Sequence, residues 1–402
     1  MTEDSAPKPP YRWVIVIASA IILAIAMGQL VNGLSAFLVP LEQYFGWSRA
    51  AVSGINSAGL IGIALGGIGM GFLADRLPIR VIGLVGASVI PLATLLAARA
   101  EALWQFYALF FIAGALGGGA LFAPIIAHVG GWFRTGAGLA IGIASAGQAV
   151  GQGLVPFALG HLIAATDWRT ALTLLGVFTA LTLVPLSLLL RPPPVGPATR
   201  APRAAAQSAP RLSSWLVLPA LSVAVLGCCT GMATPLMHLV PLIQGVCGVA
   251  AEAGGPLLAM LIAAVAGRVF FGALSDRIGA MGAWMAATGW QTALMMGFLL
   301  WDSLPEFYLF AVLYGFGYGG VMTGVLVTAR ALAPPSRAAS ATGIVLAFGW
   351  LGHPLGGWQG GAFFDLTGSY TASFAVATLA GAINLGVLGL LLLALRRRVA
   401  VA

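Results

Sequence analysis

One charged side chain is predicted to lie deep inside an apolar helix. Arg268 lies eight residues before Asp276, which corresponds to about 12 Å of helix, within a predicted apolar span at 252–274. A guanidinium at that depth is costly without a partner, and its planar fork of N–H donors matches a carboxylate. Every Asp and Glu falls in a predicted loop, tail or helix end. The expected partner is therefore a small organic anion; the alternative is an arginine that caps helix carbonyls or reaches toward water.

Two histidines and several neutral side chains could complete such a site. His238 and His353 lie in the same half of the sequence as Arg268, and histidine is the side chain whose ordinary pKa allows proton transfer near neutrality. Each is expected to contact substrate or carry a proton, with a hydrogen-bonded packing role as the alternative. The other candidates are Gln29, Asn32, Tyr314, Tyr318 and Trp350. The first four are expected to line the cavity with polar groups, and Trp350 is expected to form an apolar wall. For each of them the alternative role is packing between helices.

The types and spacing of the residues give little support for a metal or cofactor site. Met232, Met237 and Met260 with His238 would form a soft-metal path, but the spacing from 232 to 237 does not stack both sulfurs on one helix face. The three cysteines lack the spacing of a zinc site. No metal and no cofactor are expected, and no catalytic constellation of an enzyme appears within the apolar spans.

The elements that position these groups must be helices in a membrane. Hydrophobic residues make up 60% of the chain and charged residues 7%, too little charge to cover a water-soluble globule. Helices satisfy their own backbone groups in lipid, and about 20 residues cross the hydrocarbon core. The sequence predicts an all-α membrane protein with twelve spans, at about 13–39, 49–73, 79–98, 103–129, 136–163, 169–190, 214–241, 252–274, 280–300, 305–329, 338–364 and 370–395.

Basic residues are divided unevenly between the two sides of these spans. Fifteen fall on the side of the N-terminus, and three, Arg49, Arg99 and Arg169, fall on the other. The positive-inside rule then places both termini in the cytoplasm, here of a bacterium with the spans in its inner membrane. This distribution explains the net charge of +8, so no nucleic acid is expected as a partner. The protein is expected to be surrounded by membrane lipid and to be a monomer.

The chain divides into two related halves. A stretch rich in Pro, Ala and Arg at 191–213 is expected to be a cytoplasmic linker between six-helix bundles at 1–190 and 214–402. Gly71-Phe-Leu-Ala-Asp75-Arg76 follows the second span, and Gly272-Ala-Leu-Ser-Asp276-Arg277 follows the eighth. Repeats of this kind are typical of transporters. Each aspartate is expected to pair with an arginine or a helix N-terminus across the interface, so Asp75, Arg76, Asp276 and Arg277 are predicted gate residues.

The motif at 71–80 resembles the loop between the second and third helices of the major facilitator superfamily, and the resemblance covers the whole chain. A narrower resemblance, to the monocarboxylate porters and oxalate:formate antiporters, rests on four stretches: Pro124 to Arg134, Gly138 to Gly147, His238-Leu-Val-Pro241-Leu, and Gly267-Arg268 to Asp276-Arg277. It implies that Arg268 holds a substrate carboxylate.

Departures from that branch restrict the substrate and the coupling. Asn32 stands where monocarboxylate porters often have a lysine, and Ala264 where they have an aspartate. The eleventh span offers His353 rather than the second basic residue of the oxalate antiporters. A single fixed positive charge favours a monocarboxylate, and the missing acid leaves histidine as the proton carrier.

The expected function is secondary active transport of a small organic anion by alternating access, coupled to protons. Anion exchange is an open alternative, as is a drug or a metal ion as substrate. A membrane sensor that binds a carboxylate without moving it is a further alternative, although no soluble signalling domain is evident.

Overall fold

Helices make up all of the regular structure in the described part of the chain. The computed structural model describes residues 11–133, 135–193, 214–248, 254–333 and 335–401. The all-helical prediction is thus confirmed. Most of the expected linker lies outside the described residues, as do Lys8, Arg134, Arg200, Arg203 and Arg211, which contributed to the predicted orientation.

The helices that precede residue 194 belong to the first half of the chain. They are α1 (Tyr11–Met27), η1 (Gly28–Asn32), η2 (Gly33–Phe37), α2 (Leu38–Phe45), α3 (Arg49–Ala74), α4 (Ile79–Ala97), α5 (Leu103–Ile112), η3 (Ala113–Gly118), α6 (Gly119–Leu121), α7 (Ala123–Gly131), α8 (Ala137–Ala165) and α9 (Trp168–Leu188). The second half forms α11 (Ser214–Cys247), α12 (Gly254–Ile278), α13 (Ala280–Met295), η4 (Met296–Leu300), α14 (Leu304–Leu332), η5 (Pro335–Arg337), α15 (Ala338–Thr367) and α16 (Thr371–Val401).

Eleven of the predicted spans correspond to helical stretches that are long and apolar enough to cross a membrane. The remaining span, 280–300, is present as the 16-residue α13 followed by the 3-10 turn η4. The span predicted to end at 241 continues to Cys247, because α11 accommodates Pro235 and Pro241 within the helix. Prolines are tolerated in membrane helices where neighbouring groups satisfy the freed carbonyls.

Two spans contain irregular turns in which the α-helical hydrogen-bond pattern changes. The first contains a π turn, η1, followed by the 3-10 turn η2, and the fourth contains the π turn η3. At η1 the chain packs closely on α8: a Cβ on Gly28 would lie 2.5 Å from the Gly151 carbonyl oxygen. Such turns frequently mark functional positions. Here η1 carries Asn32, which lines the central cavity described below.

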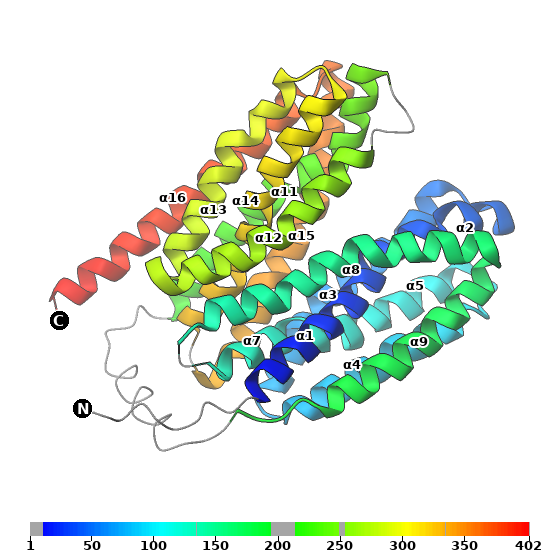
Figure 1. Ribbon diagram of the computed structural model, residues 1–402, viewed down its shortest axis with the longest axis horizontal. Coiled ribbons are helices and arrows are strands. Elements are labelled where there is room, and N and C mark those ends of the chain that lie inside the picture. The colour runs from blue at the N-terminus through cyan, green and yellow to red at the C-terminus, as the bar shows by residue number, and fades with distance from the viewer. Residues whose placement is uncertain (1–10, 134, 194–213, 249–253, 334, 402) are drawn as a thin grey trace.

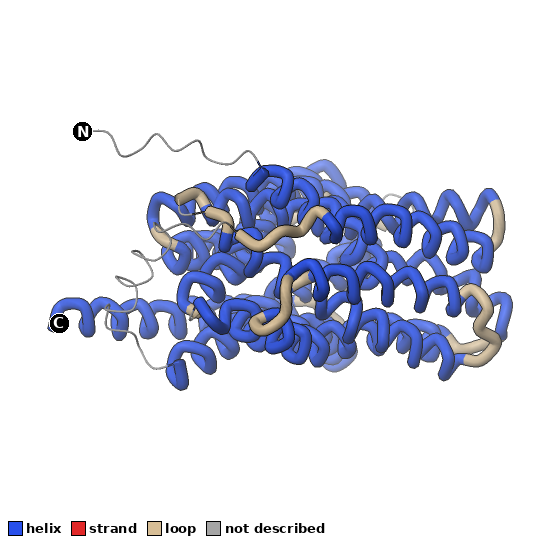
Figure 2. Tube along the Cα trace, turned by 90° about the horizontal axis from the view of Figure 1, so that it is seen from below, coloured by secondary structure: helices blue, strands red, loops and turns tan. Residues whose placement is uncertain are grey.

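The helices form two groups that meet at one end. Figure 1 shows α1–α9 in one group and α11–α16 in the other, close together where α1 begins and diverging at the opposite end. In Figure 2 most helices run along one direction, with described loops at both ends. The groups contact each other through α3 with α15 and through α8 with α12. We call the end where they meet, which holds Asp75 and Asp276, the aspartate end.

Candidate functional site

A cavity of about 860 Å³, including its part open to solvent, lies between the two groups of helices. Its lining comes from η1, α3, α8 and Phe122 on one side and from α11, α12, α14 and α15 on the other. Apolar side chains dominate the lining, and no acidic residue is found among the described residues that form it. The cavity therefore offers a mostly apolar, two-sided site that a relative movement of the halves would reshape.

Arg268 supplies the fixed positive charge of this cavity. Its side chain is 1% exposed, and Nη1 donates to the Ser145 carbonyl oxygen at 3.0 Å and to Oε1 of Gln148 at 3.1 Å. Both acceptors are neutral and belong to α8, across the interface between the halves. The buried Nε has no hydrogen-bond partner among the described residues. An unsatisfied buried donor costs about 1–3 kcal/mol, so an anion that accepts from the guanidinium would be stabilised here.

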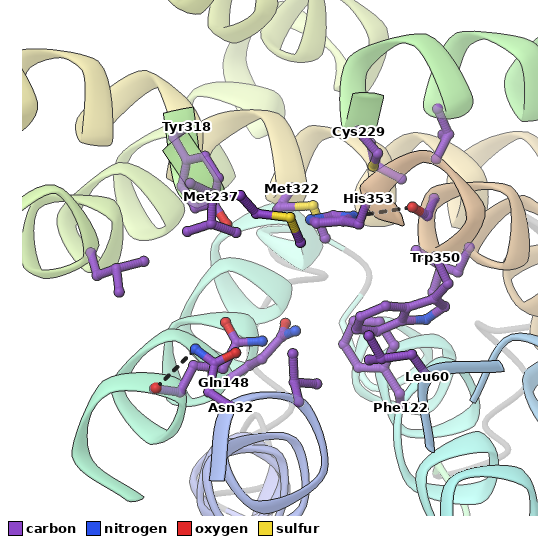
Figure 3. Close-up of a pocket in the computed structure, with 18 of the residues that line it drawn as sticks. Asn32, Leu60, Phe122, Gln148, Cys229, Met237, Tyr318, Met322, Trp350 and His353 are labelled. Atoms are coloured by element: carbon purple, nitrogen blue, oxygen red, sulfur yellow. Dashed lines mark hydrogen bonds between the residues drawn. The ribbon is translucent and has the colours of Figure 1, made fainter. Parts of the chain in front are cut away.

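Four other predicted residues line the same cavity: Asn32, Tyr318, Trp350 and His353. The Asn32 amide donates to the Gln152 carbonyl at 3.1 Å, and His353 Nδ1 bonds to the Gly349 carbonyl at 3.1 Å. Tyr318 is close enough to Arg268 to interact with it electrostatically. In Figure 3, Asn32 and Gln148 lie on one side of the cavity and Trp350 on the other.

Three predicted residues are not part of the cavity lining. Gln29 is buried between Thr94 and Thr179, donating to one hydroxyl and accepting from the other. Tyr314 lies one helical turn from Tyr318 and outside the cavity lining. It contacts Met295 Sδ at the end of α13 and the Phe298 ring of η4.

His238 also lies outside the cavity lining. Its Nε2 bonds to the Gly357 carbonyl at 2.8 Å, and its ring lies 5.4 Å from that of Tyr370. For Gln29, Tyr314 and His238 the packing role is the one seen in the structure. Of the four residues in the alternative soft-metal path, only Met237 lines the cavity.

The structure also adds residues that the sequence did not single out. Asn56 from α3 lines the cavity with a buried Oδ1 that lacks a partner among the described residues. Cys229 and Phe122 contribute to the wall as well. Asn56 could have been found as a polar residue within a predicted span, whereas nothing in the sequence distinguishes Phe122 from the other buried phenylalanines.

The two motif aspartates make equivalent contacts at the aspartate end. Asp75 accepts from the backbone N–H groups of Ala339 and Ser340 at 3.0 and 3.1 Å, at the start of α15. Asp276 accepts from those of Gly138 and Leu139, both at 2.9 Å, at the start of α8. A carboxylate at a helix N-terminus satisfies free N–H groups and interacts favourably with the helix dipole. Of the two partners expected, each aspartate thus uses a helix N-terminus, while Arg76 and Arg277 are exposed.

A third polar contact joins the halves at the same end. Arg330 near the end of α14 donates from Nε to the Ala127 carbonyl of α7 at 3.3 Å, and its side chain packs against Gly130. All three contacts link one half to backbone groups of the other. They would have to break if the halves separated at this end.

Comparison with known proteins identifies the family. The sequence description of the Major Facilitator Superfamily matches residues 19–357. The chain belongs to this superfamily. As a major facilitator, it is a multi-pass membrane transporter and not an enzyme.

Relatives of this major facilitator include transporters of both animals and bacteria. Monocarboxylate transporter 13 of Rattus norvegicus is 28% identical over 92% of this chain and 86% of its own. The uncharacterized MFS-type transporter YcxA of Bacillus subtilis is 23% identical over 92% of both chains. A crystal structure of XylE with two introduced tryptophans matches the fold with a TM-score of 0.77 at 14% identity, over 93% of this chain and 94% of that one. The protein is therefore a major facilitator related to the monocarboxylate transporters.

Proposed function

We propose that this transporter moves a small monocarboxylate across the membrane, together with a proton. The observation that carries the proposal is Arg268: a buried guanidinium on the cavity wall whose only hydrogen-bond partners among the described residues are neutral. A carboxylate would supply the missing negative charge and two acceptor oxygens for charge-assisted hydrogen bonds. The resemblance to relatives named monocarboxylate transporters supports the same substrate class.

Transport would proceed by alternating access of the two halves, 1–190 and 214–402, joined by the linker at 191–213. In the conformation described, Asp75 and Asp276 hold the halves together at the aspartate end. A carboxylate that draws the Arg268 guanidinium away from α8 would weaken a further contact between the halves. Asp75, Arg76, Asp276 and Arg277 are the proposed gate, and the positive-inside bias supports a cytoplasmic position for this gate and for both termini. A single chain provides both halves, consistent with a monomer in a bacterial inner membrane.

His353 is the proposed proton carrier. It lines the cavity together with Arg268, whereas His238 does not. Its Nδ1 donates to a carbonyl, which leaves Nε2 as the nitrogen that can take up a proton. A proton on His353 and a negative charge at Arg268 would cross together, so the transported pair would carry no net charge.

Uptake by proteoliposomes tests this function. The purified protein would be reconstituted and given radiolabelled monocarboxylates, with and without an inward-acid pH gradient. Arg268→Gln is expected to abolish uptake, because the amide cannot neutralise a carboxylate. Arg99→Gln, the same change in an exposed loop, is the matched control and should transport like the wild type. Failure of the wild type to take up any monocarboxylate, or full uptake by Arg268→Gln, would refute the proposal.

A further inference from the structure

The lining of the cavity favours a ligand with an apolar body. Most of the described residues that form it are apolar, among them Leu60, Leu261 and Val325. Sites that hold organic molecules are mostly apolar, with a few polar groups that fix the orientation of the ligand. The lining therefore suits a ligand with an apolar body beyond its carboxylate.

The amide side chains of the cavity and its aromatic wall lie on different sides, and His353 lies beside the wall, with its ring centroid 6.0 Å from that of Trp350. Figure 3 shows Asn32 and Gln148 on one side and Trp350, Phe122 and Leu60 together on the other. Gln148 marks the position of the guanidinium, because it accepts from Arg268 at 3.1 Å. A ligand bound through its carboxylate beside Gln148 thus faces an apolar wall across the cavity.

That wall is aromatic. The rings of Trp350 and Phe122 lie edge to face with centroids 5.9 Å apart, one from each half of the molecule. Aromatic rings favour further aromatic partners in offset or edge-to-face contact, worth more than the area they bury. A flat apolar group inserted here would contact both halves at once.

The cavity offers no counter-charge for a cationic group. Its described lining contains no Asp or Glu, so an ammonium would leave water without gaining a negatively charged partner. This feature disfavours amino acids, which carry both charges, relative to the carboxylates of the same shape that lack the amine.

We propose that the substrate is a monocarboxylate with an aromatic or similarly bulky apolar tail and no amine, whose carboxylate meets Arg268 and whose tail packs against Trp350 and Phe122. This inference rests on the proposed function, and it narrows the substrate class within it.

Three ligands of graded shape test the inference in proteoliposomes: propanoate, 3-phenylpropanoate and L-phenylalanine. The second adds a ring to the first, and the third adds an ammonium to the second. The wild type is expected to transport 3-phenylpropanoate with kcat/KM at least about tenfold above that of propanoate, because the ring buries its apolar surface. L-Phenylalanine should neither be taken up nor compete. Equal or better transport of propanoate, or transport of L-phenylalanine, would overturn the inference.

A variant of the wall provides the second arm. Trp350→Leu is expected to reduce the ratio of kcat/KM for 3-phenylpropanoate over propanoate several-fold. The ratio is measured within one variant, so it does not depend on how much of that variant folds. Trp358→Leu, on the same helix but 71% exposed, is the matched control and should keep the wild-type ratio. An unchanged ratio in Trp350→Leu would overturn the assignment of the tail site.

The outcomes separate the inference from the proposed function. Propanoate uptake that needs Arg268, without any preference for the phenyl compound, would overturn the inference alone. Absence of uptake for both carboxylates would overturn the proposed function and the inference with it.

Discussion

Arg268 combines two features that are seldom found together in a buried arginine. Its guanidinium is almost fully removed from solvent, yet its partners are a carbonyl and an amide rather than an acid. Neutral acceptors keep the side chain oriented without cancelling its charge. Because these acceptors belong to the other half of the molecule, the proposed ligand binding and the contact between the halves involve the same group.

His353 provides the residue-scale prediction. His353→Asn should retain uptake driven by a substrate gradient but lose the stimulation by an inward-acid pH gradient, because asparagine cannot take up a proton in the range near 6.5 where histidine does. Uptake would be measured at fixed internal pH while the external pH is lowered from neutral.

His161→Asn is the matched control for this test. His161 makes the same bond to the carbonyl four residues earlier, Phe157, at 3.0 Å, but it is exposed and does not line the cavity. The His161→Asn variant should keep the stimulation of uptake by the pH gradient. If His353→Asn kept it too, another group would carry the proton.

The contrast between Tyr314 and Tyr318 shows how far a sequence can specify a site. The apolar run around Arg268 and the count of residues from Asp276 predict its depth in a span, and the cost of a charge in lipid predicts that it is functional. The two tyrosines are one turn apart on α14 and chemically the same, but one lines the cavity and the other packs on η4. Which of them meets the cavity depends on how α13 and α14 pack, and no local pattern carries that information.

At the scale of helices, small residues decide how closely the halves approach. Gly272 of α12 faces Gly138 and Gly142 of α8, and a Cβ on Gly272 would lie 2.6 Å from the Gly138 carbonyl oxygen and 3.0 Å from Gly142 Cα. Both of those atoms belong to the backbone, so neither can move aside alone. The interface between α8 and α12 therefore depends on this glycine.

Gly272→Ala is accordingly expected to prevent full closure at the aspartate end. Alanine favours a helix over glycine by about 1 kcal/mol, so α12 itself should not be weakened, and the defect should lie in the contact between the halves. Spin labels on Arg80 and Ile278, which are exposed in opposite halves, should report a longer distance in the variant than in the parent protein.

Gly289→Ala is the control, because nothing lies within 4 Å of a Cβ at that glycine of α13. It should leave the distance unchanged. The same distance in Gly272→Ala as in the parent would show that the interface adjusts to the added methyl group and that closure does not depend on Gly272.

Helix positions were largely predictable, and helix irregularities were not. Long apolar runs bounded by charges identify the spans because lipid admits few other structures. The π turns at η1 and η3 arise where glycines of neighbouring helices come into contact, such as Gly28 on Gly151. The same residues are compatible with a regular α-helix, so the turns depend on packing partners far away in the sequence.

At the scale of the whole molecule, the contacts between the halves are concentrated at the aspartate end. Asp75 and Asp276 each bind a helix N-terminus there, and Arg330 binds a carbonyl. Figure 1 shows the halves diverging toward the other end. The described conformation is thus closed at the aspartate end, and the proposed alternating access requires a second conformation in which these polar contacts are broken.

Paired distance measurements test for that second conformation. One pair of labels, on Arg80 and Ile278, reports on the aspartate end; a second pair, on Arg99 and Asp302, joins loops of opposite halves at the other end. Saturating substrate at low pH is expected to lengthen the first distance in part of the population and to shorten the second. A third pair, on Arg99 and Asp167 within one half, should not change. Because a rigid rotation of the halves couples the two ends with opposite sign, movement at one end alone, or a change in the third pair, would rule out a rocking motion and indicate local bending of individual helices instead.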